Sequence, residues 1–309
     1  MSSAIQPLAV ARAGALLRLQ DYAELLKLRV TSLIVMTAWC GFYLGAVKDG
    51  ASSLDWSLLH AMLGVGLVAA GTAAMNEVLE RDADARMRRT AQRPLPAKHM
   101  SVAHATAVGL AAILGGVVYL SLSTNLLTGV LALATSVTYL GVYTPLKKVS
   151  PVCTFIGAFP GAMPGVLGWT AVRGRLELEA LVLFAIVFFW QFPHFHSIAW
   201  LYREDYENAA IRMLPVVDSD GRSTARSIVM HSVLLIPVTL APTLLHMSGW
   251  IYLAGALLLG VAFLWTGVRL ARLHMTPRQA ASKEAARQVL VASVFYLPLL
   301  FALMMLNAA

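Results

Sequence analysis

Three oxygen-bearing side chains stand at four-residue intervals near the end of the second long apolar stretch of the sequence. They are Asn76, Glu80 and Asp84. In a helix, residues four apart lie close to one face, so the amide and the two carboxylates should form a row about 12 Å long, at roughly 1.5 Å per residue. Mg²⁺ takes oxygen ligands, commonly one or two carboxylates together with substrate phosphates. The row therefore indicates a magnesium site, although a charged helix end that leaves a bilayer would contain the same residue types.

Arginines follow this row within ten residues. They are Arg86, Arg88, Arg89 and Arg93, and the segment then continues as Pro94-Leu95-Pro96. A guanidinium group matches the geometry of a phosphate through paired hydrogen bonds. Carboxylates for a metal ion and guanidinium groups for phosphate, placed together at the end of an apolar stretch, predict a site that handles a diphosphate.

The composition of the chain is that of a polytopic membrane protein. Of its 309 residues, 58% are hydrophobic and only 13% are charged, and the mean hydropathy is +0.69. A soluble domain has about 25% charged residues. A membrane-spanning helix needs about 20 apolar residues. Nine stretches meet this requirement, near 28–47, 58–78, 101–122, 125–143, 150–171, 178–200, 227–246, 250–268 and 288–307. The sequence thus predicts an all-α protein with nine transmembrane helices.

Residues 1–27 precede the first apolar stretch. They lack the short apolar region and the small-residue cleavage site of a signal peptide. We therefore expect an N-terminal tail and interfacial segment at 1–27 and a transmembrane domain at 28–309.

The distribution of basic residues predicts the orientation in the membrane. With the N-terminus in the cytoplasm, only Lys48, Arg173 and Arg175 of the 24 lysines and arginines fall on the outside. Cytoplasmic loops of membrane proteins are enriched in Lys and Arg, so this asymmetry supports a cytoplasmic N-terminus and an external C-terminus. The net charge of +8 is explained by topology in a lipid bilayer, and nucleic acid is not an expected partner.

Two inside loops, at roughly 80–100 and 201–226, are long and rich in charge of both signs. They follow the second and sixth spans, so they project to the same side and we expect them to face one another. The second loop adds the carboxylates of Glu204, Asp205 and Glu207. The apolar stretches contain no Asp, Glu, Lys or Arg near their centres, where an ion-coupled transporter usually has ionisable groups.

Two histidines precede the second loop. His194 and His196 are two residues apart, so on a helix their side chains point about 200° from each other and are not expected to bind one metal ion together. A histidine near the membrane face could contact a metalloporphyrin or form a hydrogen bond with a neighbouring helix. The residue pattern leaves both alternatives open.

Several motifs in order resemble a known family. Asn76, Glu80 and Asp84, followed by Arg89-Thr90-Ala91-Gln92-Arg93-Pro94-Leu95-Pro96, resemble the signature of the UbiA superfamily of intramembrane prenyltransferases. Within it, residues 143–147, 190–200 and 202–215 resemble the members that farnesylate haem. The resemblance covers about residues 25–305 and implies a UbiA-type bundle.

The resemblance implies an enzyme, a Mg²⁺-dependent prenyltransferase. It would transfer the farnesyl group of farnesyl diphosphate to a vinyl group of haem b, with addition of water, and so give haem O for the synthesis of terminal oxidase haem. It also implies a location in the bacterial plasma (inner) membrane, with terminal-oxidase assembly proteins or haem A synthase as partners. Two alternatives remain: another UbiA-type enzyme that prenylates an aromatic acid, and a non-catalytic transporter of haem or lipid.

The site residues that the resemblance implies fall into three groups. The catalytic residues and metal ligands are Asn76, Glu80, Asp84 and Asp205. The residues that bind the diphosphate are Arg89, Arg93, Lys147 and Arg203. The candidates for contact with haem are His194, His196, Tyr202 and Tyr206.

Two positions depart from the superfamily pattern. Glu80 stands where aspartate is usual, and we expect metal binding to survive because the charge is the same. The second superfamily motif is usually Asp-x-x-x-Asp, but here Ala209 stands four residues after Asp205. Glu204 and Tyr202 are therefore alternative ligands in the second loop.

Overall fold

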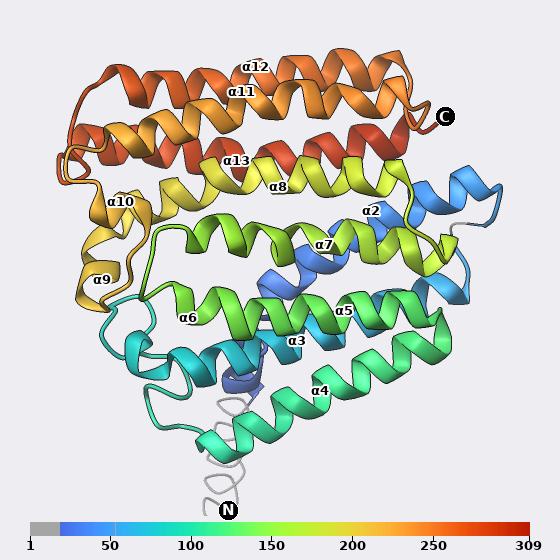
Figure 1. The fold of residues 1–309 in the computed structure, drawn as a ribbon, viewed down its shortest axis with the longest axis horizontal. Coiled ribbons are helices and arrows are strands. Elements are labelled where there is room, and N and C mark those ends of the chain that lie inside the picture. The colour runs from blue at the N-terminus through green and yellow to red at the C-terminus, as the bar shows by residue number, and fades with distance from the viewer. Residues whose placement is uncertain (1–18, 53) are drawn as a thin grey trace, which may run out of the picture.

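A computed structural model describes residues 19–52 and 54–309 of the chain (Figure 1). Within these residues the protein is helical and has no β-strand, and one isolated β-bridge joins Ser248 to Ala308. Nine helices in this part of the chain are long and apolar enough to cross a membrane, which confirms the predicted number. Most of the predicted N-terminal tail, residues 1–18, lies outside the described residues.

The long helices alternate in direction along the chain. They are α2 (Leu28–Asp49), α3 (Trp56–Asp84), α4 (Val102–Ser123), α5 (Leu126–Thr138), α7 (Cys153–Arg173), α8 (Leu178–Leu201), α11 (Arg222–Leu244), α12 (Trp250–Arg272) and α13 (Ala280–Leu306). The span that begins with α5 continues through a π-helical turn, η1 (Tyr139–Tyr143), into α6 (Thr144–Leu146). Two short helices, α9 (Arg203–Asn208) and α10 (Leu214–Val217), lie between α8 and α11.

Two helices extend well beyond their predicted bounds. The apolar stretch predicted an end near residue 78 for α3 and a start near 288 for α13, whereas α3 continues to Asp84 and α13 begins at Ala280. Hydropathy locates only the part of a helix that suits the bilayer, and the backbone hydrogen bonds continue past it. The predicted first inside loop is therefore shorter, at 85–101, and the acidic row lies on the last turns of a helix.

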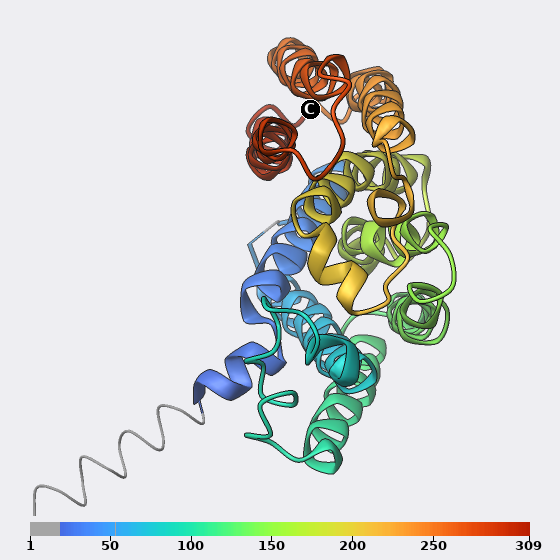
Figure 2. The same ribbon diagram turned by 90° about the vertical axis from the view of Figure 1, so that its left-hand side faces the viewer.

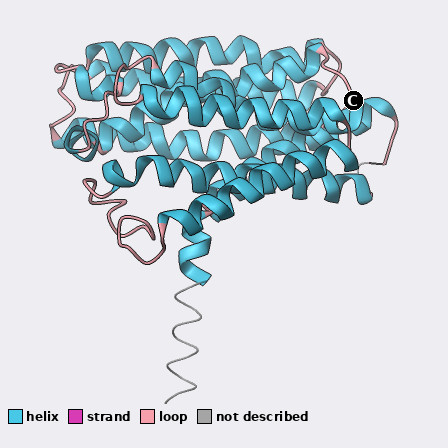
Figure 3. Cartoon of the chain, turned by 60° about the horizontal axis from the view of Figure 1, so that its bottom comes forward, coloured by secondary structure: helices cyan, strands magenta, loops and turns pink. Residues whose placement is uncertain are grey.

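The helices pack into an elongated bundle in which α8 is central. It contacts α7 on one side and both α11 and α13 on the other, while α2 packs on α7 and α3 packs on α4. Figure 2, turned by 90°, shows the helices nearly end-on, with α11–α13 grouped away from α3 and α4. The loops gather at the two ends of the helices (Figure 3). The α3–α4 connection, α9 and α10 share one end, at the left of Figure 1, and the C-terminus lies at the other.

The contact between α2 and α7 depends on small residues. A Cβ atom at Gly168 would overlap the backbone of Ala38, and one at Gly41 would overlap the backbone of Gly165. Small residues let membrane helices approach until their backbones touch. The glycines that the sequence concentrates in the fifth span thus bring α2 against the centre of the bundle.

The segment before α2 also packs against the bundle. Residues 19–25 are helical, and Leu25 is buried in a cluster with Ala74, Leu95 and Ala105. A turn at residues 26–27 then puts Lys27 in the left-handed backbone region, with φ 45° and ψ 50°. This break coincides with the predicted boundary between 1–27 and 28–309, and the division into two domains stays a prediction.

Candidate active site

The predicted acidic row forms on the last turns of α3. Asn76, Glu80 and Asp84 are all buried, and the side-chain amide of Asn76 donates to Glu80 Oε2 at 3.0 Å. It also donates to the hydroxyl of Thr144 at 3.3 Å, which links the row to the span that carries α6. The four-residue spacing therefore places the three side chains on one helix face, as the sequence predicted.

Each member of the row faces a cation from another segment. Lys27 Nζ donates to Asn76 Oδ1 at 2.8 Å, and Lys147 Nζ donates to Glu80 Oε1 at 2.8 Å. Arg93 Nη1 donates to Asp84 Oδ2 at 2.8 Å. Burying charges is costly unless they are paired and hydrogen-bonded, so these contacts stabilise a site with oxygen ligands and cations side by side.

The π-helical turn η1 precedes the Lys147 side of this site. It brings the rings of Tyr139 and Tyr143 to 5.0 Å between centroids, and Lys147 Nζ lies 4.5 Å from the centroid of the Tyr143 ring. π-Helical turns are rare in proteins, and many of those that occur lie at functional sites. An ammonium group over an aromatic ring is also a favourable contact, so Tyr143 helps to hold Lys147 beside Glu80.

The second loop meets the first through several polar contacts. Arg88 lies 3.4 Å from Glu204 and 3.7 Å from Asp205, measured between side-chain nitrogen and oxygen atoms. Arg89 donates to the hydroxyl of Tyr206 at 3.4 Å and lies over the ring of Tyr202 at 5.2 Å. The two charged loops thus face each other, as predicted, and Asp205 lies at the same end of the bundle as the row on α3.

Arg203 is placed differently from the other predicted phosphate ligands. Its guanidinium group is buried and donates to the carbonyl oxygens of Asp218 at 3.1 Å and Val216 at 2.9 Å. The side chain of Asp218 in turn accepts from the N–H and the hydroxyl of Thr224 at the start of α11. Arg203 therefore holds the second loop in shape instead of facing the row on α3.

The two histidines contact different helices, in agreement with their spacing. His194 Nδ1 is hydrogen-bonded to Ser293 Oγ on α13 at 2.8 Å, and its ring stacks on Trp190. His196 Nε2 is hydrogen-bonded to Ser227 Oγ on α11 at 3.1 Å. The Nδ1 atom of His196 is buried without a partner among the described residues, so this ring is sealed between α8 and α11.

Lys27 is a site residue that the sequence analysis did not identify. Burial, together with the nearby positive charges of Arg93 and Lys147, lowers the pKa of Lys27 to about 8. A lysine just before a membrane span is typical of the inside face, and nothing in this position predicts the left-handed turn at Lys27 or the hydrogen bond from its amine to Asn76.

The donor set suits a hard cation that arrives with its own phosphate ligands. Amide and carboxylate oxygens are ligands that Mg²⁺ prefers. Among residues 19–52 and 54–309, no three acidic, histidine or cysteine side chains come together as a ready-made metal site, and the carboxylates of Glu80 and Asp84 are each paired with a cation. The residues fit a magnesium–diphosphate complex, since the phosphate oxygens would pair with the cationic side chains and complete the coordination of the metal.

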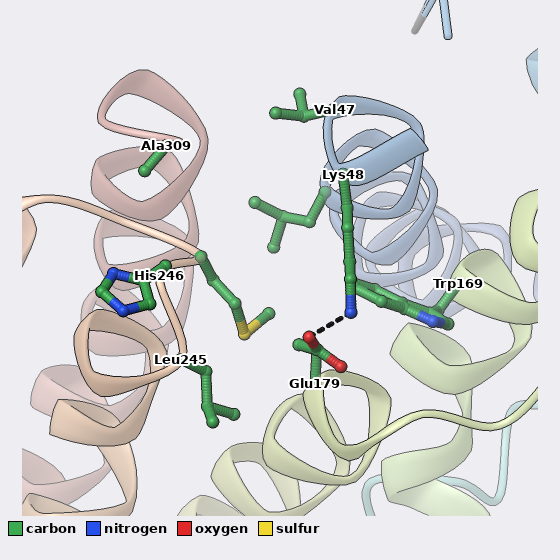
Figure 4. A pocket seen from close by; sticks show the side chains of 9 residues that line it. Val47, Lys48, Trp169, Glu179, Leu245, His246 and Ala309 are labelled. Carbon is green, nitrogen blue, oxygen red and sulfur yellow. Dashed lines mark hydrogen bonds and ion pairs between the residues drawn. The ribbon is translucent and has the colours of Figure 1, made fainter. Parts of the chain in front are cut away.

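A cavity of about 300 Å³ lies at the opposite end of the bundle (Figure 4). Its wall includes an ion pair between Lys48 and Glu179, with Lys48 also 5.8 Å from the ring of Trp169. Leu245 and His246 form the facing wall. None of the residues of the acidic row or of the two inside loops lines this cavity.

This chain belongs to the UbiA prenyltransferase family, whose profile matches residues 34–291. Together with the nine apolar helices, the family defines a multi-pass integral membrane protein. The fold agrees: a digeranylgeranylglyceryl phosphate synthase superposes with a TM-score of 0.75 over 94% of this chain and 98% of its own, at 17% identity. A UbiA homologue from Archaeoglobus fulgidus, bound to GPP and Mg²⁺, superposes with a TM-score of 0.60 over 92% of this chain and 99% of its own, also at 17% identity.

Relatives with much higher identity share one name. A protein from Koribacter versatilis (strain Ellin345), named Protoheme IX farnesyltransferase, is 61% identical over 307 residues, which cover 99% of each chain. A protein of the same name from Solibacter usitatus (strain Ellin6076) is 48% identical over 295 residues, which cover 94% of this chain and 99% of that protein.

Proposed function

We propose that this protein transfers the farnesyl group of farnesyl diphosphate to a vinyl group of haem b, with addition of water, and so makes haem O for terminal oxidases. The observation that carries the proposal is the set of hydrogen bonds from Lys27, Lys147 and Arg93 to the three oxygen ligands on α3. Phosphate-binding cations and metal-binding oxygens thus occupy one buried site, in a chain whose relatives bear the name of this activity.

In this proposal, Asn76, Glu80 and Asp84 on α3 would hold Mg²⁺, and Asp205 would contribute from the second loop. When bound, Mg²⁺ neutralises negative charge on the diphosphate oxygens. Lys147 and Arg93, which pair with Glu80 and Asp84 in this structure, would bind the diphosphate of the substrate. The other cations that we assign to the diphosphate are Lys27 and Arg89, whereas Arg203 is assigned to the shape of the loop.

The positions of these cations give them a catalytic role. The bond between the allylic carbon and the diphosphate oxygen breaks, and its electron pair leaves with the diphosphate. Lys147 and Arg93 are held beside the site, so they are placed to stabilise the negative charge that develops on the diphosphate. The vinyl group of haem b attacks the allylic carbon, and the porphyrin-side cation then takes up water and loses a proton.

For the acceptor, His194 is the histidine that we assign to haem b. Its Nδ1 is fixed by Ser293 and its ring by Trp190, whose Nε1 donates to the Ser293 carbonyl at 2.9 Å. Its Nε2 has no hydrogen-bond partner among the described residues and is the nitrogen left for an iron atom. A hydrogen bond on the other ring nitrogen is the usual support for a metal-binding histidine. His196 is enclosed, and Tyr202 and Tyr206 contact Arg89 on the diphosphate side.

The acid-bearing end of the bundle faces the cytoplasm in this proposal, and the C-terminus faces outward across the bacterial plasma (inner) membrane. Lys48, Arg173 and Arg175 gather at the C-terminal end with acidic partners, which agrees with the charge asymmetry of the loops. Terminal-oxidase assembly proteins or haem A synthase would then be partners that use the product.

The test is a reconstitution of the purified protein in lipid nanodiscs with haem b, farnesyl diphosphate and Mg²⁺. We expect haem O by chromatography, and none when the metal is removed by a chelator. Prenylated 4-hydroxybenzoate in place of haem O would show an aromatic-acid prenyltransferase instead. Bound haem without any prenyl transfer would show a carrier protein.

A further inference from the structure

Glu77 is a buried carboxylate to which the proposed chemistry gives no task. It follows Asn76 on α3, and one helical step of about 100° turns it away from the acidic row. Its side chain is 0% exposed. Oε1 accepts a hydrogen bond from the backbone N–H of Leu95 at 3.4 Å, whereas Oε2 has no partner among the described residues. A buried carboxylate with an unused oxygen is costly, so a compensating interaction must stabilise it.

The first interaction fixes the turn that follows Arg93. In the segment Pro94-Leu95-Pro96, only Leu95 has a backbone N–H, since proline lacks this group. Leu95 is buried, and a buried N–H requires an acceptor. Glu77 supplies that acceptor and so ties the turn to α3, directly beside Arg93, which binds Asp84.

The second interaction is with positive charge. Lys27 donates to Asn76, the residue next to Glu77, and Arg93 stands two residues before Leu95, whose N–H donates to Glu77. Both positive charges are therefore carried by the segments that meet the Glu77 carboxylate. The segment that ends in Lys27 comes this close because Leu25 packs with Leu95. Glu77 therefore stands where α3, the turn after Arg93 and the segment before α2 meet.

We infer that Glu77 is a positioning residue, whose carboxylate holds Arg93 and Lys27 in place to receive the diphosphate of the substrate. Glu77 itself does not touch the substrate. The inference rests on the proposed function for the identity of that substrate. It predicts that loss of the Glu77 charge weakens diphosphate binding, which a role in packing alone would not do.

Two substitutions separate the charge from the hydrogen bond. Glu77→Gln keeps the size and an acceptor oxygen for Leu95 but removes the charge, whereas Glu77→Asp keeps the charge on a shorter side chain. The measurement is the Kd of the unreactive analogue farnesyl thiodiphosphate with Mg²⁺ in nanodiscs, together with KM and kcat for farnesyl transfer. We expect Glu77→Gln to raise Kd and KM about tenfold and Glu77→Asp about threefold, with kcat changed less than about threefold in both.

Glu179→Gln is the matched control, because Glu179 pairs with Lys48 at the other end of the bundle. It should leave Kd unchanged. The opposite ranking would be a wild-type Kd for Glu77→Gln and a higher Kd for Glu77→Asp. It would mean that Glu77 acts only as a hydrogen-bond acceptor. A fall in kcat at constant Kd would place it in the reacting centre. Either result overturns the inference.

A second measurement covers the case in which Glu77→Gln does not fold. Glu77→Asp is then combined with Arg93→Lys, and their effects on Kd should be non-additive if Glu77 acts through Arg93; additive effects would contradict the inference. The binding assay contains no haem. A wild-type protein that binds the analogue but makes no haem O would therefore refute only the proposed function, whereas a failure to bind the analogue would refute both.

Discussion

Lys147 donates to both carboxylate oxygens of Glu80, at 2.8 and 3.1 Å, although the two residues are 67 positions apart in the chain. The pair joins the end of α3 to the residue that follows α6. Both side chains are largely buried, so each charge depends on the other for its stability. In the proposed function, Mg²⁺ would replace Lys147 as the partner of Glu80, and the diphosphate would replace Glu80 as the partner of Lys147.

The first prediction concerns the acidic row. Glu80→Gln and Asp84→Asn should each lower farnesyl transfer at least about a hundredfold, as expected when an interaction that stabilises the transition state is lost. The measurement is the rate of haem O formation at saturating haem b and Mg²⁺, with Glu179→Gln as the control that keeps the wild-type rate. Nearly normal activity in both row variants would remove these residues from the proposed site.

Periodicity was sufficient to predict this row, because a spacing of four residues defines a face of a helix wherever the helix lies. Hydropathy likewise predicted nine spans, since the bilayer imposes a minimum apolar length. Lys27 could not be found in this way. A lysine at the head of a span is read as an anchor on the inside face, and its direction depends on a left-handed turn and on the packing of Leu25, which are not local properties of the sequence.

Arg203 shows a second limit of the sequence pattern. It is surrounded by charged residues that suit a phosphate site, but its acceptors are the carbonyl oxygens of Val216 and Asp218. Any residue type supplies a carbonyl, so the sequence contains no signal for such a contact. The same holds for the unequal environments of His194 and His196, which are decided by the helices that pack on either side of α8.

The second prediction separates the two histidines. His194→Gln should weaken the binding of haem b at least about tenfold and change the absorption spectrum of the bound haem, because it removes the proposed iron ligand. The Kd of farnesyl thiodiphosphate should stay unchanged. His196→Gln is the control and should keep the wild-type haem spectrum, since its ring is enclosed between α8 and α11. The reverse result would assign haem to His196.

The third prediction concerns Arg203. Arg203→Lys should speed limited proteolysis within residues 209–221, because a single ammonium group cannot replace a guanidinium fork that bridges two carbonyl oxygens. The Kd of farnesyl thiodiphosphate should change less than about threefold. Arg93→Lys should raise the Kd of farnesyl thiodiphosphate and leave the rate of proteolysis unchanged. If Arg203→Lys instead weakens binding as much as Arg93→Lys in a protease-resistant loop, Arg203 is a direct ligand of the diphosphate.

The fourth prediction is a pH dependence at the other end of the bundle. Glu177 accepts hydrogen bonds from Arg173 at 2.8 Å and from Trp169 at 3.1 Å. The hydrogen bond from Arg173 is the main cause that lowers the pKa of Glu177 from 4.5 to about 2. Because this pKa is lower in the folded state, the stabilisation is fully present above pH 4.5 and is lost as the pH falls toward 2.

Thermal unfolding in detergent checks the direction of this pH dependence. Glu177→Gln should have a lower Tm than the wild type above pH 4.5, and the difference should shrink as the pH falls toward 2. Glu284→Gln, on the exposed face of α13, is the control and should show no such trend. A difference in Tm that is constant over this range would mean that Glu177 stabilises the protein by packing and not by its charge.

The fifth prediction concerns orientation. Residues 218–221 lie in the loop after α10, at the same end as the acidic row, whereas Ala309 lies at the end that carries Lys48 and Arg173 (Figure 1). A reporter fused at Ala309 should therefore be external, and one inserted near Ser219 should be cytoplasmic. An insertion at Ala51, between α2 and α3, is a further external control. Reporters at Ala309 and Ser219 on the same side would contradict nine spans. A complete reversal would keep the nine spans but place the proposed diphosphate site outside the cell, away from the cytoplasmic supply of farnesyl diphosphate.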